Sequence, residues 1–147
     1  YSMQVSDEST SLIAGLNISK NTENWSYGGQ ITFKNKIDDK EWSYGNGFTL
    51  NGWAGKNLSD SIWGSIRLSY ADIDSIDGRD MRIMAPVQTA NPKNYGGSNY
   101  KLSFGLNKRL SNGDNLDFEL SIPFEQKLNG PQMEEDLTLT FGYKKGF

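Results

Sequence analysis

Residues 134–147 read EEDLTLTFGYKKGF, and apolar side chains alternate with polar or small ones along this stretch. Leu137, Leu139, Phe141 and Tyr143 share one parity, and Thr138, Thr140 and Gly142 lie between them. Successive side chains of a β-strand point to opposite faces of the sheet. The period of two therefore predicts a strand with one apolar and one polar face, and the apolar stripe must face something other than water.

The same alternation recurs along the chain, broken by clusters of Asn, Asp, Gly and Ser. Several runs exceed the roughly 5–6 residues typical of strands in soluble proteins, and no window has a helical period. Long consecutive strands joined by hairpins are typical of an antiparallel up-and-down meander. We predict one all-β domain over residues 1–147, with strands over 1–6, 10–20, 25–37, 41–57, 61–72, 99–111, 115–126 and 135–147.

Composition excludes several classes of function. Apolar residues make up 35% of the 147 residues, and no run approaches the roughly 20 apolar residues of a membrane helix. Cys and His are absent, which removes thiol chemistry, imidazole bases and Ser-His triads. The net charge is -3 without a basic run, so nucleic acid is not an expected partner. The first residues do not resemble a signal peptide, so we expect a mature form, a fragment or a cytosolic protein.

Two architectures fit the two-faced strands. In a soluble sandwich the apolar face would form the core and the polar face would meet solvent. In a membrane barrel the apolar face meets lipid and the polar face lines the lumen. Three further patterns favour the barrel. The breaks NTEN, LSD and SNGD are short, whereas residues 72–98 and the break KLNGPQMEE are long and fall at the other end of the strands, as in outer-membrane barrels.

The second pattern is aromatic and the third concerns charge. Aromatic side chains fall near the ends of the apolar stripes, as the two interfacial girdles of a barrel require. Lys108 and Lys145, the charges on the apolar face, fall at predicted strand ends where they can reach the interface. The predicted interfacial aromatics are Trp42, Tyr70, Tyr100 and Phe124 at the outer rim, and Trp25, Tyr27, Tyr143 and Phe147 at the inner rim.

These patterns predict a transmembrane β-barrel, or the C-terminal part of one, in the bacterial outer membrane. The expected partners are outer-membrane lipid and lipopolysaccharide, the barrel-assembly machinery through the C-terminal strand, and a small solute. Assembly into a homo-oligomer and binding to an envelope protein partner are further alternatives. A barrel of about eight strands is filled by its own side chains, so passage of a solute requires further strands.

Two stretches resemble a known family. They are MAPVQTANPKNYGGSNYKLSFGLN (84–107) and LDFELSIPFEQKLNGPQMEEDLTLTFGYKKGF (116–147). Their PVQTA-P loop, paired glycines, Gly-x-Asn and Glu-x-x-x-Pro strands and LNGPQ segment resemble outer-membrane transport proteins of the phenol-degradation meta-pathway type. The resemblance implies a larger barrel that passes small hydrophobic or aromatic compounds. Lys145 departs from the apolar residue expected at that position of the last strand.

The polar face supplies candidate site residues. Charged side chains there are candidates for a selectivity constriction, and the alternative is cross-strand ion pairing that fills a narrow barrel. Lys101, Arg109, Asp117 and Glu119 are on neighbouring strands, which favours pairing. The candidates are Lys34, Arg67, Lys101, Arg109, Asp117 and Glu119.

Clustered carboxylates suggest a second candidate site. Asp72, Asp74, Asp77 and Asp80 lie in one predicted loop beside Gly78, and oxygen ligands suit Ca²⁺. Ile76 breaks the spacing of an EF-hand, so a solvated loop is the favoured interpretation. Glu119 and Glu125 are roughly 20 Å apart on one strand, too far for joint catalysis. We therefore expect no enzymatic activity and no cofactor.

Two rival functions remain open. A secreted β-sandwich that binds carbohydrate would use Trp42, Trp53 and Trp63 as stacking platforms. A non-conducting barrel would serve as a scaffold for an envelope partner.

Overall fold

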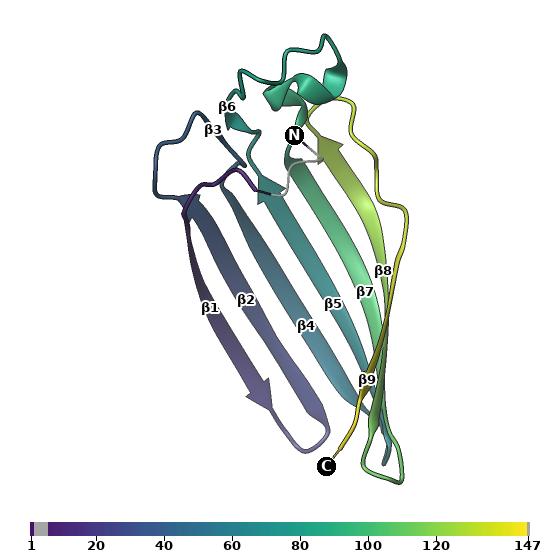
Figure 1. Cartoon of the computed structure of the whole chain (residues 1–147). Helices are drawn as coiled ribbons and strands as arrows, with labels where there is room; N and C mark the ends of the chain where they lie inside the picture. The colour runs from purple at the N-terminus through teal and green to yellow at the C-terminus, as the bar shows by residue number, and fades with distance from the viewer. Residues whose placement is uncertain (2–5, 147) are drawn as a thin grey trace.

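A single antiparallel sheet dominates the molecule (Figure 1). The computed structural model describes residue 1 and residues 6–146. Seven strands follow one another in the sheet in chain order, so the predicted all-β meander is confirmed. They are β1 (Ser11–Asn21), β2 (Trp25–Lys36), β4 (Gly47–Ser59), β5 (Ile62–Ile73), β7 (Gly97–Arg109), β8 (Asn115–Leu128) and β9 (Thr138–Lys144).

The described sheet is curved but open. β1 pairs with β2 and β9 pairs with β8, and no ladder joins β1 to β9 within the described residues. The expected closed barrel is therefore not seen in this part of the chain. β9 begins at Thr138, later than the predicted 135, and pairs only with the Asn115–Ser121 part of β8. Beyond it, Gln126 extends the edge through two hydrogen bonds with the backbone of Glu135, at 2.9 and 3.1 Å.

The register confirms the predicted division into an apolar and a polar face. Cross-strand partners share a face of the sheet. Leu68 pairs with Gly52 and Leu102, and Leu139 pairs with Leu120, on the apolar face. On the other face Ser103 pairs with Arg67 and Ser121. A one-residue shift would exchange the faces, so the register determines what each face presents.

Burial is inverted relative to an ordinary soluble domain. Apolar side chains are open both on the central strand β5, where 51% of Leu68 is exposed, and on the edge strand β9, where 61% of Leu139 and 71% of Phe141 are exposed. Polar Ser103 and Ser121 on the opposite face are buried. Cavities of about 420 and 360 Å³ lie on that polar face. The polar face is therefore the concave one, and nothing in the described chain covers the apolar face.

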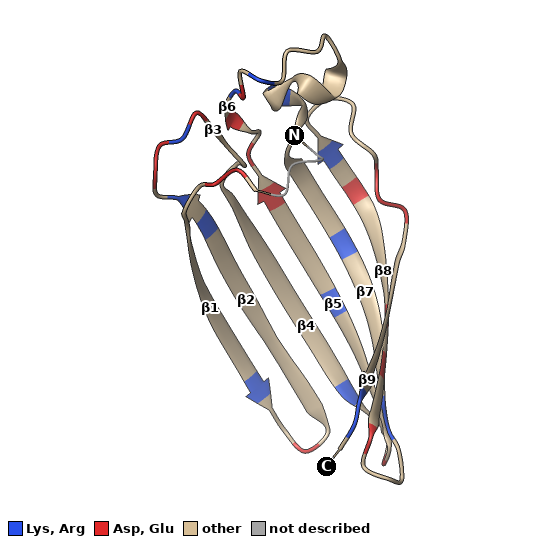
Figure 2. Cartoon of the chain, in the orientation of Figure 1, with Lys and Arg blue, Asp and Glu red and all other residues tan. Residues whose placement is uncertain are grey.

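The connections differ in length between the two ends of the sheet. The three short turns (22–24, 60–61 and 110–114) lie at the same end as the C-terminus (Figure 1). The long connections (37–46, 74–96 and 129–137) lie at the other end. This arrangement confirms the predicted alternation of connections. Figure 2 shows that charged residues gather mainly at the two ends of the strands and in the long connections.

Residues 37–46 and 74–96, together with Tyr1, form a cap over the end with the long connections (Figure 1). Tyr1, Trp42 and Ile76 are its buried centre, and the Trp42 ring lies 5.0 Å from the Tyr1 ring, centroid to centroid. The cap contains β3 (Trp42–Ser43) paired with β6 (Asp77–Gly78), and the 3₁₀ turns η1 (Gln88–Ala90) and η2 (Pro92–Asn94).

The cap corrects two predictions. Trp42 is 5% exposed inside the cap, so it is not an interfacial aromatic of the sheet. The strand predicted over 41–57 is interrupted at residues 44–46. A Cβ atom on Gly45 would lie 2.0 Å from the backbone oxygen of Asp74, so the chain leaves the sheet where only glycine fits. Residues 2–5 of the strand predicted over 1–6 lie outside the described residues.

We predict that a methyl group at Gly28 destabilises the sheet and that one at Gly52 does not. A Cβ at Gly28 would lie 2.5 Å from the Ile18 backbone oxygen and 2.7 Å from the Trp53 ring, whereas nothing lies within 4 Å at Gly52. G28A should lower the free energy of unfolding by about 1–3 kcal/mol, measured by urea titration of the folded protein. Equal effects of G28A and G52A would contradict the packing of the Trp53 ring against Gly28 of β2.

Candidate functional site

An ion pair and a pair of serines occupy the middle of the concave face. The guanidinium of Arg67 on β5 donates a short hydrogen bond to the Glu119 carboxylate on β8, across the intervening strand β7. Ser103 and Ser121 lie beside this pair and are hydrogen-bonded to each other at 2.7 Å. The ion pair neutralises both charges on a face that is partly shielded from water, where an unpaired charge would be costly.

The other predicted lumen charges have partners that differ from the expected ones. Lys101 forms a short ion pair with Glu135 in the connection 129–137, and not with a residue of β8. That lysine, followed by the Thr138 hydroxyl, lowers the pKa of Glu135. Asp117 accepts a short hydrogen bond from Asn107. Lys34 and Arg109 lie on the same face at opposite ends of the sheet, Lys34 near the cap and Arg109 near the short turns, and both are exposed.

Two tryptophans contribute an aromatic floor to the concave face. Trp53 on β4 and Trp63 on β5 are half-buried and line the cavity of about 420 Å³. Each indole occupies the space of an absent side chain, because Trp53 lies against Gly28 and Trp63 lies against Gly55. The cavity also presents polar side chains, which are Ser26, Gln30, Asn51, Ser65, Arg67 and Glu119.

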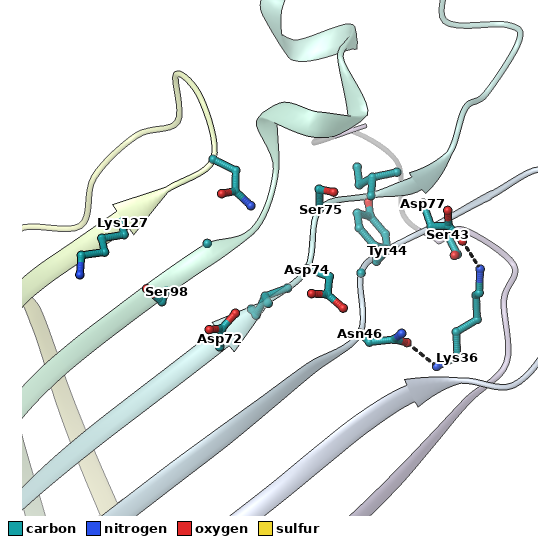
Figure 3. Close-up of a pocket in the computed structure, with 15 residues that line it drawn as sticks. Lys36, Ser43, Tyr44, Asn46, Asp72, Asp74, Ser75, Asp77, Ser98 and Lys127 are labelled. Atoms are coloured by element: carbon teal, nitrogen blue, oxygen red, sulfur yellow. Dashed lines mark hydrogen bonds and ion pairs between the residues drawn. The ribbon is translucent and has the colours of Figure 1, made fainter.

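A second polar cavity, of about 600 Å³, lies where the cap meets the ends of the strands (Figure 3). Lys36 contributes an ion pair with Asp77 at 2.6 Å, and its backbone N–H donates to the Asn46 side chain at 2.7 Å. The lysine lowers the pKa of the Asp77 carboxyl, chiefly through their hydrogen bond. Figure 3 shows Asp72, Asp74 and Ser98 along the same rim.

The aspartates predicted as a cation site do not converge. Asp72 accepts from the Tyr70 hydroxyl at 2.7 Å, and Asp77 pairs with Lys36. Asp80 is buried and pairs with Arg82 through contacts of 2.9 and 3.0 Å. Within the described residues, no three acidic side chains are grouped to hold a metal ion. The prediction that these aspartates lie in a solvated loop is wrong for Asp80, because its side chain is buried and paired with Arg82.

Aromatic side chains on the apolar face form a row across five strands. Near the capped end, neighbouring ring centroids lie 6.1, 5.5, 4.4 and 5.8 Å apart. The row contains three of the predicted aromatics, and its members are Phe33, Phe48, Tyr70, Tyr100 and Phe124. Near the other end, Trp25, Tyr27 and Tyr143 are exposed on the same face, and Phe147 lies outside the described residues.

Sequence reasoning named Trp53 and Trp63 only as stacking platforms of a soluble sandwich and did not place them among the lumen residues. Trp53 shares its parity with Asn51, and Trp63 shares its parity with Ser65 and Arg67, so alternation alone assigns both tryptophans to the polar face. Glu135 carried no such signal, because it lies in an irregular segment. Asp114 was also missed, although it joins the turn 110–114 to the end of β9.

Asp114 accepts hydrogen bonds from the Tyr143 hydroxyl at 2.5 Å, the Gly146 backbone N–H at 3.0 Å and the Asn112 amide at 2.7 Å. The Tyr143 bond first, then the Gly146 bond, lowers the pKa of the Asp114 carboxyl. A carboxyl whose pKa is lowered by folding stabilises the folded state above the unfolded pKa, near 4. That stabilisation is lost as the pH falls through the lowered pKa.

We therefore predict that D114N destabilises the protein at pH 7, and that its difference from wild type shrinks towards zero as the pH falls below about 4. Urea titrations over this range measure the effect. D60N is the matched control, because the side chain of Asp60 in the turn 60–61 forms no hydrogen bond or ion pair among the described residues. A pH-independent difference for D114N would contradict the assignment.

Comparisons of the chain with protein-family models, with curated proteins and with solved structures find no match. No helix in the described part of the chain has the length and apolar character needed to cross a membrane. The chemistry of the concave face and the exposure of the apolar face are therefore what bear on function.

Proposed function

We propose that the chain forms part of a bacterial outer-membrane β-barrel through which small solutes diffuse passively. The observation that carries the proposal is the inverted distribution of polarity. The apolar face of the sheet is open, and the concave face holds the polar groups. Lipid would cover the first face, and a water-filled lumen would contact the second.

The aromatic residues support a membrane orientation. The row across β2, β4, β5, β7 and β8 lies near the capped end, and Trp25 and Tyr27 lie near the other end. Phe33 and Trp25 are roughly 26 Å apart along β2, at about 3.3 Å per residue. The apolar band of an outer-membrane barrel is about 25 Å tall and has aromatic girdles at both interfaces.

The two ends of the sheet support a direction of insertion. Short turns and the C-terminus lie together, and the cap lies at the opposite end. Outer-membrane barrels have short periplasmic turns and long outer connections. We therefore place the cap outside the cell, with Lys56 over the Trp25 ring at 5.3 Å near the periplasmic interface.

Passage of a solute requires the sheet to close. The unpaired edges of β1 and β9 would be joined directly or through further strands, because open edges are not tolerated in lipid. The resemblance of residues 84–107 and 116–147 to outer-membrane transport proteins supports the second route and a transport role. A sandwich receives less support, because the described chain places only the small β3–β6 ribbon beside the main sheet.

Adjacent residues of β9 provide a matched test of lipid contact. Leu139 lies on the apolar face opposite Leu120, and Thr140 lies on the concave face opposite Glu119. L139K should weaken folding into lipid vesicles by about 2–4 kcal/mol, the cost of a lysine at the bilayer midplane. T140K should change it little. Gel mobility with and without heating, combined with urea titration in vesicles, measures both variants.

A protein that stays monomeric and folded in water without detergent, and in which L139K behaves like T140K, would contradict the membrane proposal.

Conductance tests the passage of ions along the concave face. E119Q leaves the Arg67 charge without its partner, so the lumen becomes more positive and chloride permeation should increase relative to potassium. The reversal potential in a planar bilayer with a KCl gradient measures this change. E23Q, in the turn 22–24, is the control and should leave it unchanged. Absence of any conductance from the intact protein would favour a scaffold over a channel.

A further inference from the structure

We propose that the concave face contains a binding site for a neutral sugar ring, centred on Trp53 and Trp63. The inference deepens the proposed function, because it names the class of solute that would pause in the lumen, and it rests on solutes reaching this face. The site is the cavity of about 420 Å³ between β2 and β8, a size within the range of about 300–1,000 Å³ typical of small-molecule sites.

The floor of the site is aromatic and held in place. Trp63 lies so close to β4 that a Cβ atom on Gly55 would be 2.6 Å from its Nε1 atom. Trp53 likewise lies 2.7 Å from a Cβ position on Gly28. Each indole is thus supported from below by the backbone of the neighbouring strand, with the concave cavity on its other side. A fixed aromatic platform can contact the apolar C–H face of a ring at low entropic cost.

The wall of the site can hydrogen-bond hydroxyl groups on several sides. Gln30 and Asn51 provide amide groups, and Glu119 provides carboxylate oxygens. The Arg67 side chain is 40% exposed and lines the same cavity, so its guanidinium N–H groups can donate to a ligand hydroxyl.

The charges in the site favour a neutral, hydroxylated ligand. Arg67 and Glu119 already neutralise each other, so an anionic ligand would compete with Glu119. A purely hydrocarbon ring would cover these charged groups without hydrogen-bonding them, which costs free energy. A sugar ring combines one apolar face with hydroxyl groups at its rim, and so matches both the floor and the wall.

Titration of the refolded full chain with glucose and with galactose tests the proposal. The protein is held in a zwitterionic detergent, because a detergent with a sugar headgroup would compete for the site. Saturation-transfer NMR detects contact with the ligand, and calorimetry gives its affinity. We expect saturable binding of at least one sugar, weakened about tenfold by W53A or W63A. W25A, on the opposite face, should bind as wild type does.

Three results would overturn the proposal. They are saturable binding of phenol without binding of either sugar, no saturable binding of any of these probes, and sugar binding that W53A and W63A leave unchanged. W53F and W63F replace the alanine variants where these fail to fold. R67K retains a positive charge beside Glu119 but removes the planar set of guanidinium N–H donors, and it should also weaken sugar binding.

Failure of the proposed function is distinguishable from failure of this inference. Sugar binding by a protein that does not insert into vesicles would support the sugar site and contradict the membrane role. Insertion and conductance without sugar binding would support the membrane role and rule out the sugar site.

Discussion

The uncovered apolar face of the sheet is the constraint on which the other features depend. Complete burial of one large aliphatic side chain contributes about 1.5–3 kcal/mol, yet Leu68, Leu139 and Phe141 are more than half exposed. The backbone is satisfied by the ladders between neighbouring strands. Cohesion of the sheet therefore comes mainly from backbone pairing, from the row of rings near the capped end and from the polar concave face, and nothing in the described chain covers the apolar face.

The concave face, in contrast, carries paired polar groups and the two indoles of Trp53 and Trp63. Arg67 reaches Glu119 over a pair of serines, and Lys101 reaches out of the sheet to Glu135. These contacts join β5, β7, β8 and the connection 129–137. They draw the strands of the right-hand part of the sheet (Figure 1) towards one another, in addition to the backbone ladders. The two indoles lie outside this network, on β4 and β5, each in the space left by a glycine of the preceding strand of the sheet.

Alternation was sufficient to predict the seven strands of the main sheet and their faces, apart from exact bounds, because a period of two follows directly from backbone geometry. It assigned Arg67 and Glu119 to one face, but not as partners, since pairing across β7 depends on the register of three strands. The cap was not predictable in this way. Trp42 continues an apolar parity in the sequence, but it lies in the cap beyond the interruption at residues 44–46, where Gly45 lies close to the backbone of Asp74. Glu135 and Asp114 act from irregular segments that have no period.

The connectivity of the sheet has a consequence for how such a molecule can change in size. Each short turn joins two strands and lies at the end with the C-terminus, whereas each long connection lies at the capped end. Two strands and their turn are thus a complete unit, which begins and finishes at the capped end. Duplication or loss of such a unit would preserve the face of every remaining strand and the end at which each connection emerges. A single added strand would instead carry the C-terminus to the opposite end. The natural step of growth for this architecture is the hairpin.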